Sequence, residues 1–437
     1  MGVSPLCGNT YRRTRAASLF GAVSSKLPVS AMFLFAQPIL GIICWRPRGK
    51  GDFAHVDASA LVQVAFVALA GLWLLGRLRN IARRLPAVLY SPPVVYLVGY
   101  LVLAGVSVLW SNYLLLTLYR TLEACVYLGL ILYTVLAARN VKEAFALLII
   151  YCMLAAGGEV FACIRNRLAL GESSIISLLH ANVAPAVASV GLFLCWLFIR
   201  DRLVQLAAWF SAAIIVVTTS VSTYAAILVT IFVILLCRAS AKARAIAFLV
   251  FGLIVVVGLV LGSFSFLADA LLYGKTDEAI EGGSGRLAMW EYYWDNVITD
   301  SPWLGQGYVA GEHQHRHGES YYTIAHNVFI AAAAGLGVLG AAICLLLAGS
   351  MLYRSSRIIG PVGVVLLAAS LCIWLNSLMM PGISGRAGPM WLVIAWLCVL
   401  VGTIWNGHLV PAQSSRDRRG VRTSGVRRNR RTAVHEK

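Results

Sequence analysis

A polar, glycine-rich stretch interrupts an otherwise apolar chain, and it holds the residues best suited to chemistry. In chain order these are Ser284, Gly285 and Arg286, then Pro302, Gly305 and Gly307, and finally His326 and Asn327. Nearly everything around them is apolar. Chemistry at the water side of a membrane would therefore have to take place here.

The composition defines the elements that must position these residues. Apolar residues make up 59% of the 437 residues, charged residues 12%, and the mean hydropathy is +0.79. These values exclude a soluble globular protein. One membrane span needs roughly 20 apolar residues, and the apolar runs supply about twelve such segments. Only helices satisfy the backbone polar groups inside each segment, so we predict an all-α polytopic membrane protein.

The chain divides into five parts on this reading. Residues 1–26 form a cytoplasmic N-terminal segment, 27–263 hold nine spans, 264–325 a large periplasmic loop with short helices, 326–405 three spans, and 406–437 a basic, disordered tail. The spans are expected near 27–45, 58–76, 87–110, 121–138, 144–163, 182–199, 203–219, 221–237, 245–263, 326–350, 358–379 and 389–405.

Basic residues orient the spans. Clusters such as Arg77 to Arg84, Arg200 with Arg202, and the arginines of the tail fall on one side, which the positive-inside rule places in the cytoplasm. Both termini are then cytoplasmic and the large loop faces outward. The net charge of +18 is explained by topology and by attraction to lipid headgroups, with no nucleic-acid partner.

The outward loop is acidic, and Arg286 is one of its few basic residues. The spacing of Leu287, Trp290, Trp294 and Val297 predicts a helix over 286–298 with these residues on one face. Arg286 would then either cap or salt-bridge this helix or serve a ligand.

The order of these pieces resembles the O-antigen ligase and polymerase family of bacterial membrane glycosyltransferases. The resemblance is carried by Gly-Arg, a tryptophan helix, Pro-x-x-Gly-x-Gly, and then His326-Asn327 followed by Gly337-x-x-Gly340, and it covers roughly residues 284–341. Two positions depart from the family pattern: Ala341 replaces the usual threonine or valine, and Gly335 a common acidic residue.

The resemblance implies an inverting transfer at the periplasmic face of the bacterial inner membrane. Glycan would pass from an undecaprenyl-diphosphate carrier to an acceptor sugar hydroxyl, without a cofactor or metal. Histidine suits the deprotonation of that hydroxyl, and arginine suits phosphate oxygens. We therefore assign His326 as general base or acceptor-positioning group, Arg286 as diphosphate clamp, and Asn327 as a binding or orienting residue. The simpler alternative is that His326 only caps the next helix.

Further substrate-binding candidates lie at other outward positions. Family members often carry Ser-Arg near the turn between the seventh and eighth spans, where this chain has hydroxyl residues over 218–224. Arginines at outward span ends are alternatives to that missing cation, although snorkelling to headgroups also explains them. The candidates are Arg120, Arg165 and Arg386, together with His180 before the sixth span.

A histidine-rich segment in the loop suggests a different site. His313, His315 and His317 would share one face of an extended strand, but no cysteine or placed fourth ligand accompanies them. We interpret the segment as solvated loop or glycan contact.

Two questions of function stay open at this stage. The rival class is a polysaccharide transporter or flippase, for which polar span residues such as Gln63, Glu159 and Asn376 would line a path. Within the enzyme class, the altered closing position favours a repeat-unit polymerase of O-antigen or exopolysaccharide over a ligase acting on lipid A core or a protein. The expected partners are the lipid-linked donor, the glycan acceptor, membrane lipids and other polysaccharide-assembly proteins.

Overall fold

The computed structural model describes residues 27–44, 58–169, 182–218, 220–238, 286–312, 315–317, 320–322, 325–380, 382–384, 387–407 and 409. The expected N-terminal segment and the expected span 245–263 lie outside these residues, as does nearly all of the basic tail. His180 and Arg386 lie outside them as well.

Helices form in the apolar runs where the sequence predicts them. Their bounds are α2 Val29–Ile43, α3 Ala58–Ile81, α4 Leu85–Leu89, α5 Pro92–Val106, α6 Leu114–Ala137, α7 Val141–Ala169, α9 Val183–Cys195, α10 Arg202–Val217, α11 Val221–Arg238, α15 Arg286–Tyr293, α16 Val328–Arg357, α17 Pro361–Ser377 and α18 Pro389–Trp405. Short 3₁₀ turns follow α5 and α9, at Ser107–Leu109 and Trp196–Phe198.

The predicted all-helical class is confirmed. The strands within the described residues are two antiparallel pieces of three residues each, β1 His315–His317 and β2 Ser320–Tyr322. Six of the described helices are long and apolar enough to cross a membrane, and five further apolar helices are shorter. The chain is therefore a multi-pass membrane protein, while twelve crossings stay a prediction because the expected span 245–263 is not described.

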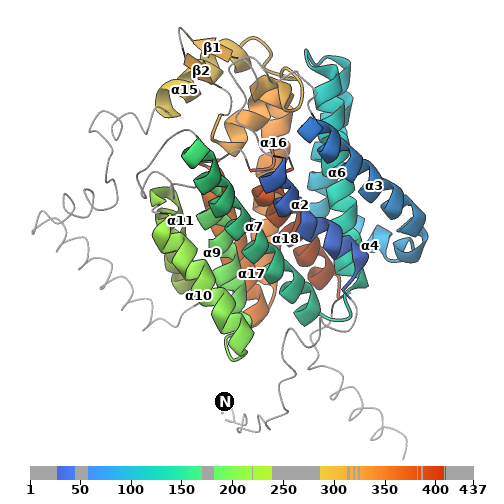
Figure 1. The fold of residues 1–437 in the computed structure, drawn as a ribbon, viewed down its shortest axis with the longest axis vertical. Helices are drawn as coiled ribbons and strands as arrows, with labels where there is room; N and C mark the ends of the chain where they lie inside the picture. Colours follow the sequence, from blue (N-terminus) through green and yellow to red (C-terminus); the bar gives the residue numbers. More distant parts are fainter. Residues whose placement is uncertain are drawn as a thin grey trace, which may run out of the picture.

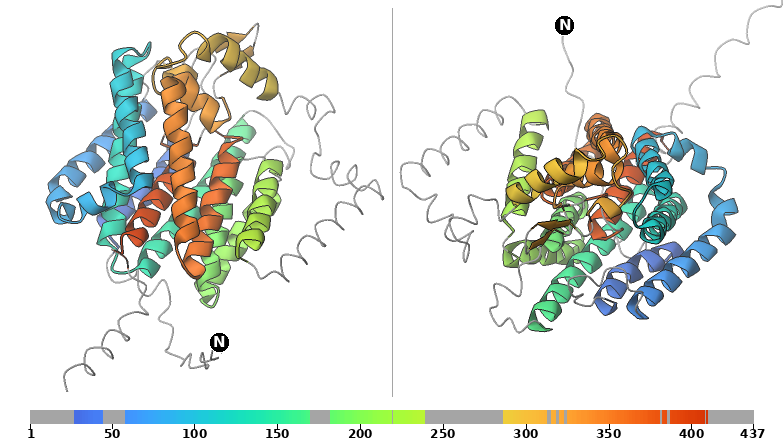
Figure 2. Two further views of the ribbon diagram at one scale, coloured as in Figure 1. Left: turned by 180° about the vertical axis from the view of Figure 1, so that it is seen from behind. Right: turned by 90° about the horizontal axis from the view of Figure 1, so that it is seen from above.

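Helix α18 forms the centre of the bundle. It packs against α4, α5, α6, α7, α9, α16 and α17. Nearly all of its residues are buried, including the side chains of Trp391 and Trp396. Such all-round burial suits a helix that is apolar on every face. Figures 1 and 2 show α3 and α11 on opposite sides of the bundle, with α16, α17 and α18 between them.

The outer helices turn apolar side chains outward. Leu72 of α3 is 67% exposed, Trp209 of α10 75%, and Leu228 of α11 67%. An apolar surface of this extent fits hydrocarbon rather than water. The short elements α15, β1 and β2 gather at one end of the bundle, beside the start of α16 (Figure 1).

Helix α16 is broken rather than continuous, which differs from the single span expected over 326–350. Gly337 has φ 66° and ψ −165°, so two helical pieces meet there. The preceding loop satisfies the backbone groups that the break releases. The N–H of Val338 donates to the carbonyl of Pro302 at 2.7 Å, and the N–H of Gly307 donates to the carbonyl of Gly335 at 2.8 Å.

The glycines of this region allow the two backbones to touch. A Cβ on Gly337 would lie 2.2 Å from the carbonyl carbon of Trp303, and one on Gly305 would lie 2.4 Å from that of Gly335. Both distances are far below van der Waals contact, and backbone atoms cannot move aside as a flexible side chain can. The Pro-x-x-Gly-x-Gly turn and the Gly-x-x-Gly segment are therefore two halves of one interlock.

Gly337→Ala tests this interlock. The new methyl group would clash with backbone atoms, and alanine would be forced into a positive φ. We therefore expect the free energy of unfolding to fall by about 3 kcal/mol or more, measured as a lower unfolding temperature of the purified protein in detergent. Gly349→Ala is the matched control. A Cβ at Gly349 meets no atom within 4 Å, so this change should be neutral or stabilising by up to about 1 kcal/mol. Equal behaviour of the two variants would contradict the interlock.

Candidate active site

Helix α15 places Arg286 beside the start of α16. The helix continues through a π-helical turn, Trp294–Ile298, so it reaches the end expected from sequence. The predicted shared face is wrong, however. Val297 is buried together with Met289 and Tyr293, whereas Leu287 and Trp294 are exposed. The buried residues lie four apart along the helix and therefore form one face of their own.

A hydrogen bond fixes α15 against the residue before His326. The indole Nε1 of Trp290 donates to the carbonyl of Ala325 at 2.8 Å. Met289 and Tyr293 pack in one apolar cluster with Ala331 and Ala334 of α16. These contacts bring Arg286, at the start of α15, close to the N-terminal end of α16, where His326 lies.

His326 occupies a strained and poorly hydrated position. Its backbone φ is 49°, in the left-handed region that few non-glycine residues adopt. Its Nδ1 is buried and has no hydrogen-bond partner among the described residues. Burial lowers the pKa of His326 below its ordinary value of 6.5, and the nearby positive charge of Arg286 lowers that pKa further. The imidazole is therefore neutral at neutral pH, which is the form that accepts a proton.

Arg286 is a half-buried cation. Its Nη1 lies 3.8 Å from the sulfur of Met379, which follows α17. No carboxylate pairs with its guanidinium in the part of the chain that the structure describes. Burial lowers its pKa from 12.5, but an arginine stays charged at any physiological pH. An anionic ligand would relieve the cost of burying this charge.

Asn327 has a structural task. It is the N-cap of α16, and its Oδ1 accepts hydrogen bonds from the N–H groups of Phe329 at 2.9 Å and Ile330 at 3.2 Å. This cap fixes the chain directly after His326. The helix-capping role considered for His326 thus belongs to its neighbour.

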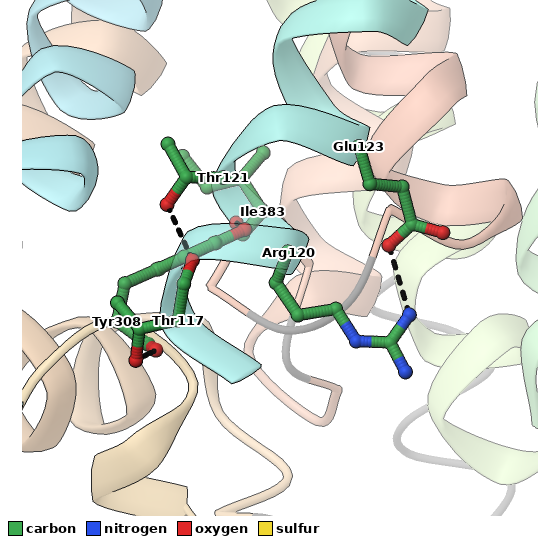
Figure 3. A network of polar contacts seen from close by, with 6 residues as sticks. All are labelled: Thr117, Arg120, Thr121, Glu123, Tyr308 and Ile383. Atoms are coloured by element: carbon green, nitrogen blue, oxygen red, sulfur yellow. Dashed lines mark hydrogen bonds and ion pairs between the residues drawn. The ribbon is translucent and has the colours of Figure 1, made fainter. Parts of the chain in front are cut away.

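Arg120 lies inside α6 rather than at its outer end. Its Nη1 forms an ion pair with Oε2 of Glu123 at 2.9 Å, one turn along the same helix. A neighbouring residue on this helix touches the glycine turn, because Thr117 Oγ1 donates to the carbonyl of Tyr308 at 3.0 Å (Figure 3). Arg120 lines a cavity whose described lining includes neither Arg286 nor His326.

The remaining candidates are not brought to the Arg286 and His326 pair by the described residues. Arg165 lies near the end of α7, is half-buried and has an interaction partner. His180 and Arg386 are outside the described residues. In the hydroxyl-rich turn, Thr218 bonds the carbonyl of Ile214 at 2.7 Å and Thr223 bonds Asn376 at 2.8 Å. These two hydroxyls are used within the bundle, which argues against their replacing the missing arginine.

Three residues near the site were missed by the sequence reasoning. Met379 contacts Arg286, and Glu123 pairs with Arg120. Tyr308 forms hydrogen bonds with three separate segments of the chain. The spacing of Arg120 and Glu123 by three residues is a signal that could have revealed their pairing on a helix. Nothing in the sequence marks Met379 or Tyr308.

The histidine-rich segment supplies no further site. The backbones of His315 and His317 lie in β1, opposite Tyr322 and Ser320 of β2. His313 lies outside the described residues. A search of the described residues finds no group of three or more histidine, cysteine or acidic side chains that could hold a metal.

Comparison with known proteins supports the family resemblance. Residues 206–345 match the family model described as O-antigen ligase. This match covers about a third of the chain and includes all of the 284–341 stretch, so the predicted resemblance is confirmed there. A search of curated proteins found no significant match.

Asn327→Ala should destabilise the protein by about 1 kcal/mol, because two N–H groups at the start of α16 lose their acceptor. Asn327→Asp keeps an oxygen acceptor and should retain the unfolding temperature. Thermal unfolding of the purified variants in one detergent measures both effects. Equal loss in the two variants would show that the cap is not what Asn327 contributes to stability.

Proposed function

We propose that the protein, whose residues 206–345 carry an O-antigen ligase domain, is a membrane glycosyltransferase of surface polysaccharide biosynthesis. It transfers glycan from an undecaprenyl-diphosphate carrier to a sugar hydroxyl at the periplasmic face of the inner membrane, with both termini in the cytoplasm. The observation that carries the proposal is the juxtaposition of Arg286, a half-buried cation with no described carboxylate partner, and His326, a neutral imidazole.

The reaction divides between these two residues. The acceptor hydroxyl oxygen attacks the anomeric carbon, and the bond from that carbon to the diphosphate oxygen breaks. The electron pair leaves with the lipid diphosphate, whose oxygens Arg286 contacts. The hydroxyl proton passes to His326. A single displacement of this kind inverts the configuration at the anomeric carbon.

The low pKa of His326 suits a base that must be free before it acts. The two causes of the shift, burial and the charge of Arg286, both favour the neutral ring. After the diphosphate binds, its negative charge offsets that of Arg286 and makes proton uptake by the ring easier. Donor binding would therefore strengthen the base when the substrates are in place.

We favour a repeat-unit polymerase over a ligase. The supporting feature is Ala341, which stands at the closing position of the ligase-type signature and packs at the edge of the apolar cluster formed by α15 and α16. Asn327, Arg165, Arg386 and His180 remain proposed substrate contacts. The lipid-linked donor and acceptor, and other polysaccharide-assembly proteins, remain proposed partners.

A gene deletion complemented with wild type or with His326→Ala, at equal membrane levels, tests the function. Loss of a general base typically slows a reaction by about 10²–10⁴-fold, so surface chains should disappear. Gel analysis of lipid-linked glycans then identifies the step. Single repeat units accumulate if the enzyme is a polymerase, and long chains accumulate on the carrier if it is a ligase. Full complementation by His326→Ala would refute the catalytic assignment and favour a transporter.

The pH dependence tests the electrostatics of the pair. Because the folded protein lowers the pKa of His326, the base loses its proton more readily, and the acid limb of kcat/KM should lie below pH 6.5. Arg286→Gln removes one cause of the lowered pKa. The acid limb of the variant's residual kcat/KM should therefore move to higher pH. Transfer by purified enzyme, assayed from pH 4.5 to 8.5, measures both limbs. An acid limb above pH 6.5 in the wild type would contradict this account.

A further inference from the structure

A polar cavity of about 320 Å³ lies inside the bundle, apart from the Arg286 and His326 pair. It is bounded by the second half of α2, the first halves of α3 and α6, the second half of α7 and the starts of α9 and α18. In the predicted topology these are all outward ends. The polar residues that line it are Gln37, Gln63, Arg120, Glu123, Glu159 and Asn182.

This lining is unusual for membrane-spanning helices. Ionisable side chains at membrane depth are costly and mark functional sites or aqueous paths. The side chain of Arg120 is 17% exposed and that of Glu123 9%. Figure 3 shows them directed toward one another on one side of α6. The Nε of Arg120 is buried and has no hydrogen-bond partner among the described residues, so the site holds a donor that a ligand can use.

The described lining favours a neutral ligand over an anion. Its one described cation, Arg120, is already neutralised by Glu123 at 2.9 Å. Carboxylates, amides and a guanidinium donor together match the hydroxyl groups of a sugar, each of which donates one hydrogen bond and accepts others.

We propose that this cavity binds the sugar end of the acceptor through its hydroxyl groups, while the donor diphosphate binds at Arg286. The inference rests on the proposed glycosyltransferase function. It makes Arg120 a residue of the acceptor subsite rather than a replacement for the missing phosphate-binding cation. The volume falls at the lower end of small-molecule sites, which suits a terminal sugar rather than a long chain.

The two subsites meet at one short segment. Met379 contacts Arg286 at 3.8 Å, and its neighbour Met380 lines the cavity. The same segment is tied to the rest of the site, because Ser384 Oγ donates to the carbonyl of Val328 at 2.8 Å. An acceptor held in the cavity would therefore lie beside the segment that contacts Arg286.

Cys163 lines the cavity and provides a direct reporter. The test protein carries His326→Ala and has alanine in place of its other nine cysteines. It is reconstituted in nanodiscs, and the rate at which N-ethylmaleimide labels Cys163 is measured. Two probes are compared: inorganic pyrophosphate, and the oligosaccharide released by mild acid from the lipid-linked glycan that the His326→Ala strain accumulates. We expect the oligosaccharide to slow labelling and pyrophosphate to have no effect.

Two matched changes define the site. Gly41 lines the cavity, and a Cβ on it or on Gly349 meets no atom within 4 Å. Gly41→Leu should abolish protection by filling the cavity, whereas Gly349→Leu should preserve it.

Glu159→Gln keeps the size of the side chain but removes its charge. It should weaken protection by about fivefold to tenfold, as expected when a hydrogen bond to a charged group becomes one to a neutral group. Recovery of each variant as a monodisperse protein excludes misfolding as the cause.

The outcomes separate the two proposals. Protection by pyrophosphate but not by oligosaccharide, or by neither probe, overturns the acceptor subsite and leaves the Arg286 and His326 pair intact. Failure of the His326→Ala strain to accumulate any lipid-linked glycan overturns the proposed function, and with it this inference. Oligosaccharide protection that Gly41→Leu removes and Gly349→Leu retains supports it.

Discussion

The main-chain contact between the glycine turn and the broken helix α16 is the constraint on which the site depends. Gly305 and Gly337 let the two backbones approach where any side chain would collide, and reciprocal hydrogen bonds from Gly307 and Val338 satisfy the groups that the break leaves open. Tyr308, directly after this turn, receives a hydrogen bond from Thr117 and donates one from its N–H to Ser107. The interlock thus aligns the loop, α6 and α16, and through them the position of His326.

Cations at the two ends of the bundle have different environments. At the end away from α15, arginines are used to hold helix ends together: Arg84 donates to the carbonyl of Leu136 at 3.1 Å, and Arg354 lies 4.3 Å from the ring centre of Trp405. Arg238 donates to the carbonyls of Ser356 and Ile358 at the end of α16. At the end beside α15, the hydrogen-bond contact described for Arg286 is the one with the sulfur of Met379. These three arginines thus hold helix ends together, whereas Arg286 is a half-buried guanidinium with no described carboxylate partner.

Much of the fold could be predicted from sequence because apolar runs and their breaks are local signals. The described helices other than α15 follow those runs closely, and the order of motifs drew attention to both Arg286 and His326. The details that failed depend on contacts distant in sequence. The face of α15 was misjudged because apolar spacing alone does not show which side packs against α16, and the break in α16 was missed because Gly337 is read as a packing residue until the backbone of Trp303 is placed against it. Likewise, six of the described helices line the cavity, and no single segment shows that Arg120 and Glu123 face it.

The central position of α18 has a consequence for how the protein is made. Chains emerge from the ribosome from the N-terminal end, and segments begin to associate as they emerge. The helix that touches seven others is the last of the described helices to be synthesised. Until it arrives, its neighbours lack their central packing partner, including α6 and α7, which carry Arg120 and Glu159. Insertion of α18 is then the event that closes the bundle.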